Sequence, residues 1–109
     1  MAEFKWRNTN ALWRMARIVF DDSQRTILFE NCIVPKKFFA LVPLKTTTCG
    51  YGEIERLRKF MQGDTRTLEL RIPTGRAIFI DDDVPNFDDF NDRLTTLTEA
   101  IDPSRIKVG

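Results

Sequence analysis

One segment near the C-terminal end carries apolar side chains at intervals of three and four residues, and this spacing places them on one face of an α-helix. Asn86 can cap the first turn through its side chain, and Asp88 and Asp89 suit the positive end of the helix dipole. Pro103 cannot continue a helix. We therefore predict a helix over residues 86–101. Its apolar stripe consists of Phe87, Phe90, Leu94, Leu97 and Ile101.

The acidic run that leads into this helix, FIDDDVPNFDDFND over residues 79–92, contains six carboxylates and no basic residue. A calcium loop of the EF-hand type needs an oxygen ligand at its fifth position and a glycine at its sixth. In the register that starts at Asp81, these two positions are occupied by Pro85 and Asn86. We therefore predict no metal site here, and interpret the acids as a solvated turn followed by a helix start.

Most of the chain before the helix is rich in β-branched and aromatic residues, which favour strands. Residues 12–20 and 25–31 flank the turn-forming stretch DDSQ, and together they predict a hairpin. Residues 37–44 predict a third strand. A further hairpin is predicted at 68–81, because apolar and polar residues alternate in LELRI before a Thr-Gly turn.

Residues 51–62 fit two interpretations. Their apolar side chains are spaced for an amphipathic helix that Gly63 would end. The same residues also alternate in the manner of a strand. Periodicity alone leaves both interpretations open.

Three stretches together resemble a pleckstrin-homology-like domain, particularly the small bacterial type. They are ARIVFDDSQRTILF, VPLKTTTCGYGEIERLRKF and LELRIPTGRAIFIDDDVPNFDDFNDRLTTL, which cover about residues 12–101. The resemblance implies that residues 51–62 form a strand. It also implies a mainly β fold with one C-terminal α-helix, in which a bent antiparallel sheet or small open barrel is plugged by the helix.

The whole chain, residues 1–109, is expected to form a single domain with an N-terminal arm at 1–10 and a C-terminal tail at 102–109. Within it, the large apolar residues of the predicted strands and helix should form the core. These are Ile18, Phe20, Ile27, Phe29, Leu41, Leu68, Leu70, Ile78, Phe79, Phe87, Phe90, Leu94 and Leu97.

Composition excludes several kinds of chemistry. The chain has no histidine, so neither Cys32 nor Cys49 has the commonest partner base for nucleophilic catalysis, and two thiols alone cannot complete a zinc shell. No cofactor loop is present, and we expect no enzymatic activity and no cofactor. No apolar run is long enough to span a membrane, so we expect a cytoplasmic protein with reduced cysteines.

We expect a non-enzymatic binding module whose partner is a protein or a second copy of the chain, joined at an open sheet edge. The alternative is an anionic ligand, a lipid headgroup or nucleic acid. The net charge of +1 argues against this alternative. We take residues 21–24 as the first hairpin turn, and this turn is acidic, whereas the phosphoinositide-binding members of the family have basic residues there. Nucleic acid is therefore not expected, and peripheral membrane contact is not favoured. The candidate binding residues are Lys36, Lys37, Lys45, Arg56 and Arg58.

Overall fold

The computed structural model describes residues 2–8, 14–32, 46–73 and 77–109. The predicted strand at 37–44, with Leu41, and the Thr74-Gly75 turn lie outside the described residues.

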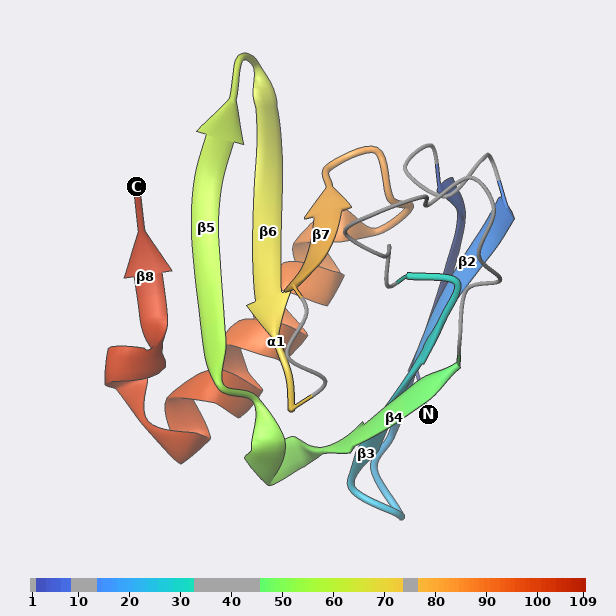
Figure 1. Cartoon of the computed structure of the whole chain (residues 1–109), viewed down its shortest axis with the longest axis vertical. Helices are drawn as coiled ribbons and strands as arrows, with labels where there is room; N and C mark the ends of the chain where they lie inside the picture. Colours follow the sequence, from blue (N-terminus) through green and yellow to red (C-terminus); the bar gives the residue numbers. More distant parts are fainter. Residues whose placement is uncertain (1, 9–13, 33–45, 74–76) are drawn as a thin grey trace.

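The first sheet has four antiparallel strands in the order β1-β2-β3-β4 (Figure 1). They are β1 (Ala2–Asn8), β2 (Arg14–Asp21), β3 (Thr26–Glu30) and β4 (Thr47–Gly50). The predicted N-terminal arm is therefore wrong, because Ala2–Asn8 pair with β2 along their whole length. The strand is held by burial as well as by pairing, since Phe4 is 4% exposed.

The second sheet contains β5 (Arg56–Gln62), β6 (Thr65–Arg71), β7 (Ala77–Asp81) and β8 (Ile106–Val108). Its order is β7-β6-β5-β8, and neither sheet closes into a barrel. The fold expected from the sequence, mainly β with one C-terminal helix, is confirmed. The expected C-terminal tail is not a free segment, because β8 pairs with β5 in parallel after a short 3-10 turn, η3 (Pro103–Arg105).

The segment that periodicity left open is a 3-10 turn, η2 (Tyr51–Glu53), followed by the strand β5. Strand pairing decides the choice, because β5 pairs with β6 along its whole length from Arg56 to Gln62. Gly63 lies in the turn between them with a φ of 62°, a conformation that glycine adopts at little cost. The glycine predicted to end a helix therefore joins two strands.

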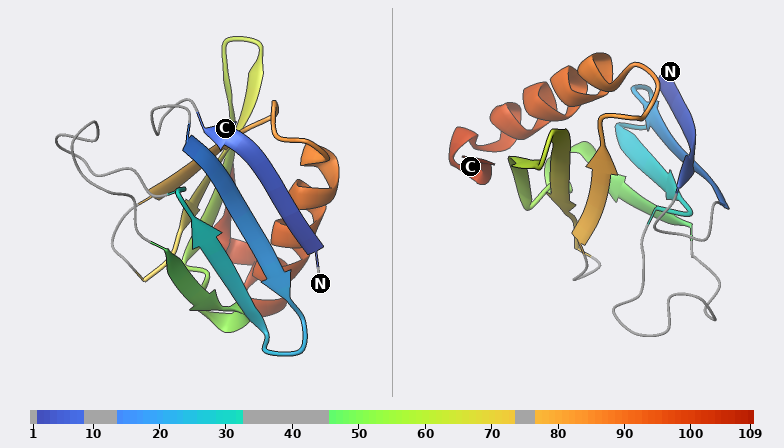
Figure 2. Two further views of the ribbon diagram at one scale, coloured as in Figure 1. Left: turned by 90° about the vertical axis from the view of Figure 1, so that its right-hand side faces the viewer. Right: turned by 90° about the horizontal axis from the view of Figure 1, so that it is seen from above.

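The helix α1 (Phe87–Ile101) lies across one end of the two sheets, from beside β1 to beside β8 (Figure 2). It is tied to the first sheet through Phe90, whose ring centroid lies 5.1 Å from that of Phe4 and 5.9 Å from that of Phe20. It is tied to the second sheet by Lys59 Nζ, which donates to Thr95 Oγ1 at 2.6 Å.

The ends of α1 agree with the prediction, but its cap does not. Asn86 is the N-cap residue, yet its backbone is left-handed with φ 60° and ψ 39°, and its side chain makes no capping hydrogen bond. Asparagine tolerates this conformation better than most residues, so backbone geometry accounts for its place there. At the other end, the N–H of Asp102 donates to the carbonyl of Thr98 just before Pro103.

The predicted core is confirmed for nearly all of its described members, which are buried. Phe79 is an error, since it is 42% exposed. Neighbouring residues of a strand face opposite sides, so Phe79 faces outward when Ile78 and Ile80 face the core. Leu97 is only half-buried, at the margin of the core.

Replacing Leu94 with alanine should lower the free energy of unfolding by about 2–5 kcal/mol, because a fully buried leucine would leave a cavity between α1 and the sheets. Urea unfolding followed by far-UV circular dichroism measures this change. Thr96→Ala, at an exposed position on the same helix, is the control. A loss under about 0.5 kcal/mol for Leu94→Ala would contradict the packing described.

Candidate functional site

One arginine from β6 contacts two acids of the run at residues 79–92, one before α1 and one in its first turn. Arg66 Nη1 lies 2.9 Å from Asp88 Oδ1, and Arg66 Nε lies 3.5 Å from Asp82 Oδ2. The backbone N–H of Arg66 also donates to Asp82. No group of three or more metal-ligating side chains occurs among the residues that the structure describes. The acids thus fasten the β7–α1 connection to β6.

Of the candidate binding residues, Lys36, Lys37 and Lys45 lie outside the described residues. Arg56 and Arg58 are brought together on β5, where they share one face because they are two positions apart. That face is opposite to the core, since Leu57 between them is fully buried.

The strand register brings further residues to this outer face of the second sheet. Arg56 pairs with Arg71, Arg58 pairs with both Glu69 of β6 and Lys107 of β8, and Glu69 pairs with Phe79 of β7. We call this surface the arginine face. It consists of Arg56, Arg58, Phe60, Glu69, Arg71, Phe79 and Lys107.

Glu69 is the centre of the arginine face. Its Oε1 lies 3.3 Å from Arg56 Nη2 and 3.2 Å from Arg58 Nη1, and its Oε2 lies 3.9 Å from Arg71 Nη2. The Glu69 side chain is only 6% exposed, whereas the three arginines are each about two-fifths exposed. The arginines therefore shield the carboxylate and leave part of each guanidinium in solvent.

The charges on this surface do not balance. One carboxylate contacts three guanidinium groups, and Lys107 adds a fourth cation beside Arg58. Asp81 is a second carboxylate on this outer face, where it accepts a hydrogen bond from the Thr67 hydroxyl, so the cations still outnumber the acids. Each arginine has five N–H donors, of which contact with one shared carboxylate uses only a few. The Nε atom of Arg56 is buried and has no hydrogen-bond partner within the described residues. The arginine face thus has an excess of positive charge and of hydrogen-bond donors.

Two aromatic rings give the arginine face an apolar component. The guanidinium carbon of Arg58 lies 4.2 Å from the centroid of the Phe60 ring, within range of a cation–π contact. Phe79 is exposed next to Glu69 in the strand register. Arg71, Lys107 and Phe79 were not predicted as site residues, although alternation along each strand indicates which of them share a face.

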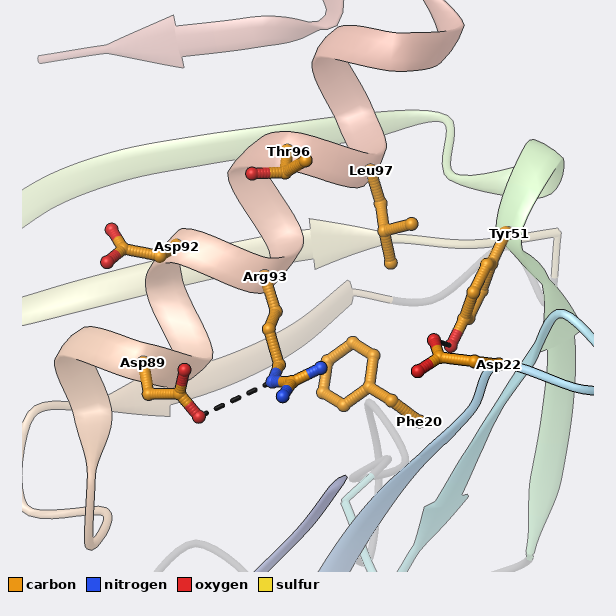
Figure 3. Close-up of a pocket in the computed structure, with 8 residues that line it drawn as sticks. All are labelled: Phe20, Asp22, Tyr51, Asp89, Asp92, Arg93, Thr96 and Leu97. Atoms are coloured by element: carbon orange, nitrogen blue, oxygen red, sulfur yellow. Dashed lines mark hydrogen bonds and ion pairs between the residues drawn. The ribbon is translucent and has the colours of Figure 1, made fainter. Parts of the chain in front are cut away.

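A second feature is an open pocket of approximately 390 Å³ between α1, η2 and the end of β2 (Figure 3). Phe20 and Leu97 provide apolar walls, and Arg93 reaches from α1 toward the Phe20 ring, its guanidinium carbon 5.9 Å from the centroid. We call this the acidic pocket. Its lining residues are Phe20, Asp22, Tyr51, Asp89, Asp92, Arg93, Thr96 and Leu97.

Two polar contacts organise the acidic pocket. Tyr51 Oη donates to Asp22 Oδ1 at 2.6 Å, and Arg93 Nε lies 3.4 Å from Asp89 Oδ2. Burial, together with the hydrogen bond to Asp22, raises the pKa of Tyr51 to about 12. With three carboxylates and one guanidinium on its walls, the pocket favours positively charged groups.

The acidic turn DDSQ joins β2 to β3 and does not belong to the first hairpin, which β1 and β2 form. Asp21 Oδ1 accepts hydrogen bonds from the Ser23 hydroxyl and from the N–H groups of Ser23 and Gln24, and these bonds hold the pKa of Asp21 below its ordinary value. The turn of the first hairpin lies outside the described residues. The acidity of DDSQ therefore no longer argues against an anionic ligand at the first hairpin.

The two cysteines are free thiols at 3% and 4% exposure. Burial raises the pKa of Cys32 and of Cys49 to about 12. A thiol attacks as its thiolate, so neither side chain is activated for nucleophilic chemistry at neutral pH.

No family model, no curated protein and no solved structure matches this chain. No helix within the described residues is long and apolar enough to cross a membrane.

Because Tyr51 is the only tyrosine of the chain, its ionisation can be followed directly by ultraviolet absorbance. We expect a pKa of about 12, and a lower pKa in Asp22→Asn, which removes the neighbouring negative charge. The raised pKa contributes stability that is fully present below the unfolded pKa of about 10 and is lost as the pH rises to about 12. An ordinary tyrosine titration in the folded protein would contradict the geometry described.

Proposed function

We propose that this protein is a non-enzymatic binding module that recognises an acidic segment of a protein partner through its arginine face. The proposal is carried by the cluster of three half-exposed arginines around the buried carboxylate of Glu69. The contacts with Glu69 hold the three arginines in place, so a partner carboxylate meets donors that need little further ordering. Arginine is also the cation best suited to carboxylates, because its planar donors match their geometry.

The mixture of charge and aromatic surface favours a protein partner over a polymer of phosphates. Glu69 lies in the middle of the arginine face, so a continuous row of phosphates would approach a fixed negative charge. An acidic protein segment can place separate carboxylates against the arginines and apolar side chains against Phe60 and Phe79. Exposed Phe79 has no role in the core that would explain a ring at this position.

The open sheet edge, where strand addition was expected, is a less suitable site next to the arginine face. Residues Leu57–Lys59 of β5 already pair with β8, and the N–H of Gly109 donates to the carbonyl of Lys59. The edge strand on that side is therefore β8, which has only three residues and offers few backbone groups to an added strand. The outer face of the sheet can be reached without any change in the fold.

An anionic ligand of low molecular mass or nucleic acid remains the second candidate, because Arg56 and Arg58 of the predicted basic surface do lie together. We also propose that the fold is of the pleckstrin-homology-like type, which is supported by the two sheets and by the single helix that follows β7. The free thiols are compatible with a reducing compartment, which supports a cytoplasmic location.

The binding proposal predicts that a dye-labelled peptide of alternating glutamate and valine binds better than a matched lysine–valine peptide. Fluorescence anisotropy measures both at about 50 and 200 mM salt. Arg58→Gln and Arg71→Gln should each weaken binding by about two- to fivefold, because each removes one partly exposed charge. Lys5→Gln, a matched loss of charge on β1 of the other sheet, should leave binding unchanged.

The competing candidate is tested in the same assay with a labelled single-stranded oligothymidylate. If the oligonucleotide binds more tightly than the acidic peptide, and its affinity falls steeply between the two salt concentrations, nucleic acid is favoured over a protein as the partner. Equal binding of the acidic and basic peptides would refute the role of the arginine face.

The proposal of a non-enzymatic protein predicts slow alkylation of both cysteines by iodoacetamide in the native protein at pH 7.5, because each thiol is buried and its pKa is raised. Mass spectrometry gives the rate for each cysteine, and the same protein in urea is the control. If Cys49 reacts much faster in the folded protein than in urea, its thiol is activated, and this result would contradict the proposal of a non-enzymatic protein.

A further inference from the structure

The arginine face and the acidic pocket lie on opposite sides of the second sheet. Lys59 and Arg58 are neighbours on β5, so their side chains leave the sheet on opposite faces. Lys59 donates to Thr95 of α1, whereas Arg58 contacts Glu69 on the outer face. The helix that carries most of the acidic pocket therefore covers the face of the sheet turned away from the arginines, and the two surfaces cannot meet within one molecule.

The charges of these two surfaces are complementary. The outer face has four cations and two carboxylates, Glu69 and Asp81, whereas the acidic pocket has three carboxylates and one guanidinium. The formal net charge of the whole chain is only +1, so two molecules repel each other little overall. Opposite patches on a nearly neutral protein favour association in one relative orientation.

The acidic pocket also has the shape and chemistry that an arginine side chain requires. Its walls combine the apolar side chains of Phe20 and Leu97 with carboxylates, which matches the apolar stem and charged head of arginine. Arg93 of the same molecule already binds in this way, since its guanidinium lies between the Asp89 carboxylate and the Phe20 ring (Figure 3). Of the other two carboxylates, Asp22 accepts a hydrogen bond from Tyr51, and Asp92 points away from that pair on the other side of Arg93, so a second guanidinium can contact one of the two (Figure 3).

We propose that the partner of the arginine face is the acidic pocket of a second copy of this chain, so that molecules associate head to tail. This inference rests on the proposed function, because it uses the same arginine face and names the acidic surface that it binds. The two contacting surfaces differ, so the contact is heterologous, and each added molecule leaves one surface of each kind free. Association therefore continues beyond a dimer unless a ring closes.

Sedimentation velocity of the unchanged protein at about 50 mM salt should show a mass that rises with concentration above the 12.7 kDa of one chain. About 200 mM salt should shift the association to higher concentration, because it screens partly exposed charges. Two double variants separate the surfaces: Arg58→Gln with Arg71→Gln on the arginine face, and Asp89→Asn with Asp92→Asn in the acidic pocket. At the concentration where half of the unchanged protein is associated, each double variant should sediment as a monomer.

A mixture of the two double variants is the decisive measurement. Each retains the surface that the other lacks, so an equimolar mixture should form a one-to-one dimer that grows no further. Asp83→Asn with Glu99→Gln removes two exposed acids outside the pocket and should associate like the unchanged protein. Circular dichroism confirms that every variant is folded.

Continued self-association of the pocket variant, or a mixture that stays monomeric, would overturn the head-to-tail contact. An unchanged protein that remains monomeric at low salt and still binds the glutamate–valine peptide would refute this inference and leave the proposed function standing. An unchanged protein that neither self-associates nor binds the peptide would refute both the head-to-tail contact and the proposed function.

Discussion

The contact between Phe90 and the first sheet is the interaction on which the arrangement of this molecule depends. Two four-stranded sheets, neither closed on itself, share one hydrophobic core, and α1 lies across one end of both. The rings of Phe4, Phe20 and Phe90 meet at edge-to-face angles with centroids 5.1–5.9 Å apart, which joins β1 and β2 to the helix. Aromatic pairs of this kind add stability beyond that of the buried area.

Both candidate surfaces follow from the position of α1. Because the helix packs against the inner face of the second sheet, the outer face of that sheet stays exposed to solvent. This outer face carries the arginine face. The acidic pocket forms where the helix passes Phe20 and Tyr51. The position of α1 thus separates positive from negative surface in a chain whose formal charge is close to zero.

Burial of Glu69 illustrates how a polar residue is accommodated outside the core. It is among the few buried charged or polar side chains of the described residues, and it is buried by arginines rather than by apolar residues. Removing a carboxylate from water is costly unless hydrogen-bond donors replace the water. The arginines provide those donors, which explains how Glu69 is buried on an outer sheet face and why the excess charge of the cluster faces outward.

The sequence by itself determined the helix, because the spacing of its apolar stripe and the proline after it are local properties of a single segment. It also determined most of the core, with Phe79 as the error, because alternation identifies the residues that share a face but does not say which face is buried. The choice of a strand for residues 51–62 followed only from the family resemblance, and pairing with β6 and β8 decides it in the structure.

Only the tertiary structure decided the sites. The residues of β1 were interpreted as an arm because their sequence alone does not indicate a strand. Pairing with β2 is what identifies them as an edge strand. Arg56 and Arg58 were predicted to bind a partner, but Arg71 and Lys107 joined them through strand pairing between distant segments. The acidic pocket likewise combines residues from β2, η2 and α1. Periodicity acts within one element, whereas a binding surface forms from the register and packing of several elements, and these depend on the free energy of the whole fold.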